Sequence, residues 1–173
     1  MIRHAVASFV VALFVFTTTS PMAAALPQST DFGFRLAVRD CPTETFDSFS
    51  GLFTKELGGP GFPRPSATTL LALSAQQMQT VSANVAAIEF FDYPARFVGI
   101  PIGQHEVTTT VPYLSYRLEV RSGGRSHAVS WDDNSKPTTV AADRLRNLLS
   151  LIIQALHDHP AYKQLPPAIG GCE

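Results

Sequence analysis

The sequence predicts an α+β fold, in which a largely antiparallel sheet of four or five strands carries two helices packed on one face. One observation is that segments with alternating apolar residues, typical of half-buried strands, occur together in blocks. Another is that each block precedes a segment whose apolar residues recur at the three- and four-residue spacing of a helix. The resulting order of three strands, a helix, two strands and a helix favours α+β over strict alternation of strands and helices.

The first half of the chain is expected to contain three of these strands. Residues 31–41 alternate between apolar and polar or small side chains, which indicates a half-buried strand. Residues 43–57 indicate a second, less regular strand, and residues 68–73 a short third one. Residues 57–67 include a run rich in glycine and proline, so we expect an exposed loop there. The side chains expected on one face of the second strand are Phe49, Gly51 and Phe53.

A helix is expected to begin at Ser74. The Ser74 hydroxyl can accept a hydrogen bond from the Gln77 amide while the Gln77 side chain bonds back to Ser74, which is the pattern of a capping box. We expect Pro94 to end this helix and residues 95–112 to form a second exposed loop. The apolar stripe of the helix comprises Met78, Val81, Val85 and Ile88, with Phe90 and Phe91 at its end.

The second half of the chain predicts a β-hairpin followed by a helix. Residues 113–122 alternate as a strand does, and Gly123 and Gly124 supply the positive φ angles of a tight turn. The second helix is expected to begin near Thr139. The return strand of the hairpin carries on one face His127, Val129 and Trp131. The apolar stripe of the helix comprises Ala141, Leu145, Leu148, Leu149, Ile152 and Leu156.

Residues 1–25 have the pattern of a secretory signal peptide. Arg3 precedes an apolar run, and Ala23 and Ala25 are spaced like the small residues before a cleavage site. An uncleaved anchor is the alternative, but polar residues interrupt the run short of the roughly 20 residues that a membrane span needs. We therefore expect residues 26–173 to form one exported domain, periplasmic or extracellular, with no stable membrane anchor after cleavage.

The charge of the chain is close to neutral. Its 13 lysine and arginine residues stand against 14 aspartate and glutamate residues, for a net charge of −1. Cleavage removes one basic residue, Arg3, and no acid, so the net charge of the exported part becomes about −2. Because acids and bases are scattered and form no basic stripe, we expect no binding to nucleic acid.

Two cysteines, Cys41 and Cys172, lie in the exported part. An even number of cysteines in an oxidising compartment favours a disulfide between them. The alternative is a thiolate nucleophile paired with a histidine, which requires a rigidly held cysteine. Cys172 is next to the last residue of the chain and is poorly placed for that role.

If the disulfide forms, replacing Cys41 with serine lowers the melting temperature of the oxidised protein by several degrees or more. The reason is that the bond restricts the unfolded chain, which gains conformational freedom when the bond is lost. Calorimetry of both proteins measures the difference. An unchanged melting temperature would show that the two cysteines are not bonded.

No metal or cofactor site is expected. His157 and His159 flank a helix end and suggest a metal site, but residues two apart on a helix point in different directions. Asp132, Asp133 and Asn134 could form a weak calcium site. They lack the spacing of an EF-hand loop, and we favour a solvated turn that caps the next helix.

The glycine-rich run also carries prolines where a phosphate-binding loop needs backbone amides.

His127 raises the question of catalysis because it lies in the predicted hairpin beside the only tryptophan. If its face of the sheet is the core, we favour a neutral imidazole that is hydrogen-bonded to a backbone group. A serine–histidine–aspartate site is the alternative, but no serine lies in a Gly-x-Ser-x-Gly turn. We therefore expect no catalytic residue and a protein that is not an enzyme, with a hydrolase of unrecognised site as the alternative.

The expected function is the binding of a partner, another exported protein. Long loops in compact domains often carry function. In the first loop, Phe62 and Arg64 lie between prolines, which reduce the conformational entropy lost on binding. The candidate partner-binding residues are Phe62 and Arg64 in the first loop and Gln104 and His105 in the second.

Two stretches carry a resemblance to known proteins. Residues 73–94 combine a capped helix with a Phe-Phe-x-x-Pro end, and residues 113–133 combine Tyr-x-Leu-x-Val, Gly-Gly-Arg and His-x-Val. With "TFDSFSGLFTKEL" and "PAYKQLP", the chain resembles an uncharacterised family of exported bacterial proteins. Its helix–hairpin–helix part is similar to emfourin, a small protein inhibitor of thermolysin-like metalloproteases. The resemblance implies the fold and, as an alternative function, inhibition of secreted proteases.

Overall fold

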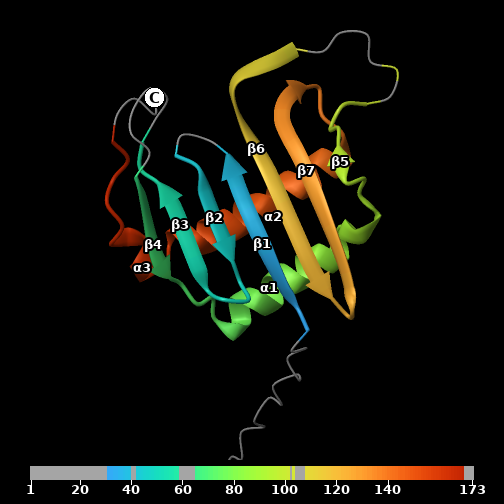
Figure 1. Ribbon diagram of the computed structural model, residues 1–173. Helices are drawn as coiled ribbons and strands as arrows, with labels where there is room; N and C mark the ends of the chain where they lie inside the picture. Colours follow the sequence, from blue (N-terminus) through green and yellow to red (C-terminus); the bar gives the residue numbers. More distant parts are fainter. Residues whose placement is uncertain (1–30, 40–41, 59–64, 102, 104–107, 170–173) are drawn as a thin grey trace, which may run out of the picture.

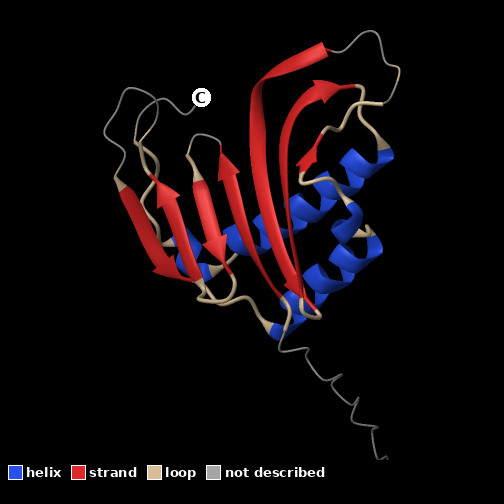
Figure 2. Cartoon of the chain, turned by 45° about the vertical axis from the view of Figure 1, so that its right-hand side comes forward, coloured by secondary structure: helices blue, strands red, loops and turns tan. Residues whose placement is uncertain are grey.

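The computed structural model describes residues 31–39, 42–58, 65–101, 103 and 108–169, and within them it confirms the α+β class (Figure 1). One sheet of seven strands carries the helices on a single face, as both views show (Figure 2). The strands are β1 (Gly33–Arg39), β2 (Glu44–Asp47), β3 (Leu52–Glu56), β4 (Ser66–Leu70), β5 (Arg96–Phe97), β6 (Thr108–Ser122) and β7 (Arg125–Lys136). The helices are α1 (Ala75–Ala87), the 3₁₀ helix η1 (Phe90–Asp92), α2 (Val140–His157) and α3 (Pro160–Lys163).

The strands are ordered β4-β3-β2-β1-β6-β7-β5 across the sheet. Neighbouring strands are antiparallel except β5 and β7, which are parallel, so the sheet is mixed. The central pair joins distant parts of the chain, since Arg35 of β1 lies opposite Glu119 of β6, 84 residues away. The predicted number of four or five strands was therefore too low, because the predicted second strand forms two strands and β5 lies in a segment that was expected to be a loop.

The predicted second strand is a hairpin of two strands, β2 and β3. The chain turns at residues 48–51, where the Asp47 carboxylate accepts a hydrogen bond of 2.9 Å from the Phe49 amide. Gly51 closes the turn with a φ of 70°, which favours glycine. Phe49 and Phe53 therefore do not share a strand face: Phe49 is 43% exposed on the turn, whereas Phe53 is buried.

Both segments that were expected to be exposed loops contain strand residues. β5 and the first residues of β6 lie within 95–112, and β4 begins within 57–67 at Ser66. β4 and β5 occupy the two edges of the sheet. An edge strand forms because its backbone pairs with one neighbour, so the alternation of its own side chains is a weak signal.

The capping box at the start of α1 is confirmed, with Ser74 and Gln77 exchanging hydrogen bonds of 2.8 and 3.2 Å. The helix ends at Ala87, however, and not at Pro94. Glu89 has a left-handed φ of 56°, and the chain then forms η1. This break turns Phe90 into the core, where it is fully buried.

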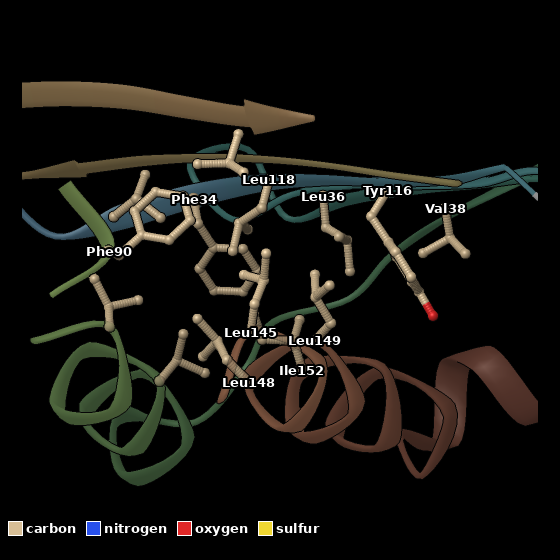
Figure 3. Close-up of a cluster of buried hydrophobic side chains, with 14 of the residues drawn as sticks. Phe34, Leu36, Val38, Phe90, Tyr116, Leu118, Leu145, Leu148, Leu149 and Ile152 are labelled. Atoms are coloured by element: carbon tan, nitrogen blue, oxygen red, sulfur yellow. The ribbon is translucent and has the colours of Figure 1, made fainter. Parts of the chain in front are cut away.

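The hydrophobic core lies between the sheet and the helices α1 and α2. Figure 3 shows apolar side chains of β1 and β6 pointing from the sheet towards α2. The stripe predicted for α2 is buried except for Ala141, which is partly buried. The sheet residues labelled in the core are Phe34, Leu36, Val38, Tyr116 and Leu118, and those of α2 are Leu145, Leu148, Leu149 and Ile152.

Candidate functional site

The candidate site is the sheet face that no described helix covers, which we call the open face (Figures 1 and 2). Since successive strand residues point to opposite sides, the apolar residues face the helices and the polar ones lie on the open face. Two hollows, of about 600 and 280 Å³, lie on this face. Both are lined by Ala37 and Arg117, so they adjoin each other.

The larger hollow, which we call the arginine groove, is formed by rows of paired residues. One row crosses four strands and comprises Ala37 of β1, Arg117 of β6, Ser130 of β7 and Arg96 of β5. The next row comprises Arg39 of β1, Ser115 of β6 and Asp132 of β7. Small residues thus lie beside each arginine, and this alternation of long and short side chains produces the depression.

Two hydrogen bonds hold the polar side chains of the arginine groove. Arg117 Nη1 donates to Ser130 Oγ at 3.3 Å, and Ser115 Oγ donates to Asp132 Oδ1 at 2.6 Å. These bonds connect side chains of β6 and β7 across the groove.

The other end of the open face carries three exposed apolar side chains, Phe49, Leu52 and Leu70, which we call the apolar platform. Leu52 and Leu70 are paired residues on β3 and β4, with 45% and 73% exposure. The Phe49 ring lies between two guanidinium groups, 5.3 Å from Arg35 and 4.8 Å from Arg121.

Gly33 makes room for the Phe49 ring. A Cβ atom at Gly33 would lie 2.3 Å from Cε1 of Phe49, well inside van der Waals contact. The ring therefore lies directly on the β1 backbone. The flanking Arg35 is itself fixed by carboxylates, at 3.1 Å from Asp47 and 3.2 Å from Glu119. Although partial burial acts to raise the pKa of Asp47, the hydrogen bonds from the Phe49 amide and Arg35 hold that pKa below its ordinary value.

Asp132, Asp133 and Asn134 lie in β7 and not in the solvated turn that we favoured. Asp132 faces the arginine groove, whereas Asp133 faces α2, where Arg146 binds both of its oxygens at 2.7 Å. The two carboxylates thus point to opposite sides of the sheet and do not share a cation. Among the described residues no group of three or more metal-binding side chains comes together.

The described histidines contact structural groups. His127 is half-buried, and its Nε2 lies 2.7 Å from the Tyr93 carbonyl oxygen, so this nitrogen donates. The favoured interpretation, an imidazole bonded to the backbone, is therefore confirmed. His159 Nδ1 accepts from the Ala161 amide and caps α3 at 3.1 Å. His157 bonds to Glu44, so the two histidines that suggested a metal site have separate partners.

Glu44, His157 and Tyr162 form a cluster, the Glu44 triad, that joins β2 to the ends of α2 and α3. Glu44 Oε2 lies 2.7 Å from His157 Nε2, and Tyr162 donates to Glu44 Oε1 at 2.8 Å. Burial raises the pKa of Tyr162, and the Glu44 carboxylate raises it further. For Glu44, burial acts to raise the pKa, but the bonds from His157 and Tyr162 outweigh it and leave the pKa below its ordinary value.

The candidate partner-binding residues chosen from the sequence, Phe62, Arg64, Gln104 and His105, lie outside the described residues. The same holds for Cys41 and Cys172, so their disulfide stays a prediction. Close to them in sequence, Thr43 accepts from the Glu56 amide and Leu57 accepts from the Ile169 amide. The described backbone nearest to the two cysteines thus converges on the end of β3.

The residues of the arginine groove and the apolar platform were not selected from the sequence. The sequence did indicate that Arg35, Arg39 and Arg117 lie on the solvent-facing side of the sheet, because they occupy the polar positions of clearly alternating strands. What was missing was the pairing that places β1 beside β6 and β5 beside β7.

Comparison with known proteins adds no further assignment. The chain matches no model of a known protein family, and no curated protein sequence matches it significantly. None of the helices formed by the described residues has the length and apolar character that a membrane span requires.

Proposed function

We propose that this protein is an exported, non-enzymatic domain that binds another protein through the open face of its sheet. The observation that carries the proposal is the exposed Phe49 ring, held between Arg35 and Arg121 on a face with two adjoining hollows. A few residues supply most of the binding energy in protein interfaces, and aromatic and arginine side chains are enriched in such interfaces. A rigidly held ring also loses little conformational entropy on binding.

The surroundings of Phe49 support a protein partner in preference to a small ligand. Leu52 and Leu70 extend the exposed apolar surface across two further strands. Arg35, Arg121 and Asp47 border this surface on one side, as in protein interfaces, where an apolar centre has a polar rim. Small ligands instead occupy enclosed pockets with mostly apolar walls. Secreted thermolysin-like proteases head the set of partners to test, because of the resemblance to emfourin.

Replacing Phe49 with alanine is expected to weaken partner binding about tenfold, or about 1.4 kcal/mol, because an interface anchor is lost. The melting temperature should change little, since the ring is 43% exposed. The partner is captured from the exported proteome on immobilised wild-type protein, identified, and titrated against each variant by calorimetry.

Two further variants make this test specific. Gly33→Ala retains the phenyl ring but displaces it, and is expected to weaken binding as Phe49→Ala does. Val140→Ala is the matched control, because Val140 is 69% exposed but lies on α2, away from the open face. Equal affinity of wild type and Phe49→Ala, or a comparable loss in Val140→Ala, would refute docking on the open face.

A further inference from the structure

The arginine groove has more positive than negative charge. Arg39, Arg96 and Arg117 are exposed, and no carboxylate of the described residues forms an ion pair with any of them. Two carboxylates line the groove, Asp132 and Asp133, and Asp133 is already paired with Arg146. Arg35, on the same face, differs because Asp47 and Glu119 neutralise it. The groove therefore attracts anions.

The spacing of the three arginines is set by the sheet. Only Ser130 separates Arg117 from Arg96 along their row, so their Cα atoms lie two strand spacings, or roughly 10 Å, apart. Arg39 is a diagonal neighbour of Arg117, at roughly 7–8 Å between Cα atoms. An extended polypeptide presents every second side chain on one side, about 7 Å apart. Carboxylates at alternate positions of such a segment match this spacing, given the reach of the arginine side chains.

From this charge and spacing we infer that the arginine groove binds an extended acidic segment of the partner protein. The inference rests on the proposed function and adds the chemistry of the partner. The groove has a volume of about 600 Å³ and is lined by polar side chains of the open face together with apolar residues on or next to β5 and β7, such as Phe97, Val98 and Trp131. It is open enough for the side chains of a larger molecule to enter, whereas a small-molecule site encloses its ligand. Guanidinium groups suit this role because they bind carboxylates through two parallel hydrogen bonds.

Asp132 limits how the segment lies. Its carboxylate is fixed by Ser115 in the row of Arg39, on the β7 side of the groove. An acidic side chain is repelled there, so the acidic residues of the segment lie towards Arg39, Arg117 and Arg96. Removing the charge of Asp132 should therefore strengthen the binding of an acidic segment. If Asp132 had only a structural role, its replacement would not strengthen binding.

The test uses the exported protein and a dye-labelled peptide of eight residues in which glutamate and serine alternate. Fluorescence anisotropy at low salt measures its dissociation constant. Each single change of Arg39, Arg96 or Arg117 to alanine is expected to weaken binding about threefold, and the triple variant about thirtyfold. Asp132→Asn should strengthen binding about twofold. Raising the salt from 50 to about 300 mM should weaken the wild type far more than the triple variant.

Arg144→Ala is the matched control, because Arg144 is an exposed arginine on α2, outside the groove. Its affinity should equal that of the wild type, and all variants should keep the wild-type melting temperature. Equal binding of a lysine–serine peptide, an equal loss in Arg144→Ala, or tighter binding of single-stranded DNA or anionic vesicles at the groove would overturn the inference. If Phe49→Ala still impairs partner binding in that case, the proposed function stands and the acidic segment alone is refuted.

Discussion

Replacing Phe90 with alanine is expected to lower the free energy of unfolding by about 4 kcal/mol. The Phe90 ring is fully buried, packs edge-on to His127 at 5.8 Å between ring centroids, and stacks on Tyr93 at 6.2 Å. Truncation removes these contacts and leaves a cavity between η1 and β7. Urea unfolding followed by circular dichroism should show a lower midpoint with an unchanged slope.

Phe91→Ala provides the control, because Phe91 is the neighbouring ring but is only partly buried, with Arg125 4.5 Å from its centroid. We expect a loss of about 1 kcal/mol for this variant. The left-handed turn at Glu89 leaves Phe90 more buried than Phe91. Equal losses of unfolding free energy in the two variants would contradict this difference. Neither change should alter binding at the open face, since both rings lie on the helix side.

The features of the fold that depend on nearby residues could be predicted from the sequence. The capping box needs only Ser74 and Gln77, and the hairpin β6–β7 needs two alternating strands around Gly123 and Gly124. The same holds for α2, whose apolar stripe defines its buried side. In each case, the residues that determine the structure are close in sequence, within one or two helical turns or within one or two strand lengths of one another.

The features that depend on distant pairing could not be predicted. Residues 43–57 contain enough apolar residues for one strand, and the turn after Asp47 depends on a side-chain hydrogen bond and on Gly51 adopting a positive φ. β5 has two residues and exists because it pairs with Ser130 and Trp131 of β7. Such pairing is a tertiary effect, which outweighs the weak local propensity of short edge strands.

The candidate site was missed for the same reason. Arg39, Arg96 and Arg117 come from three separated parts of the sequence and meet only through the registers of β1, β6, β7 and β5. Sequence reasoning favoured the glycine- and proline-rich segment, because long loops often carry function. A regular sheet surface carries no local motif, so its hollows become visible only once the strand order is known.

Replacing Glu44 with glutamine is expected to lower the free energy of unfolding at pH 7 by about 2 kcal/mol. The Glu44 side chain is only 12% exposed and accepts bonds from two donors, His157 Nε2 and the Tyr162 hydroxyl. A glutamine keeps a single acceptor oxygen, so one donor loses its partner and faces an amide NH₂ instead. Because these bonds join β2 to α2 and α3, the amides of α3 should also exchange hydrogen faster in the variant.

The loss should depend on pH in a defined direction. The pKa of Glu44 in the folded protein lies below its ordinary value of 4.5. The folded state therefore binds this proton less readily than the unfolded state, and stability from the carboxylate is complete above about pH 5. As the pH falls below 4.5 and through the lowered pKa, Glu44 becomes protonated and this stability disappears. The difference between wild type and Glu44→Gln should accordingly shrink between about pH 5 and about pH 3.

Glu56→Gln is the matched control for this effect, because Glu56 lies on the adjacent strand β3 and forms no ion pair with the described residues. Its stability should follow that of the wild type at every pH. Urea unfolding at pH 7, 5, 4 and 3 gives the comparison, with Tyr162→Phe as a second probe that removes one donor and leaves the carboxylate and His157 in place. A constant difference between wild type and Glu44→Gln across this range would show that the side chain contributes through packing alone and that the charge of Glu44 does not join β2 to the helix ends.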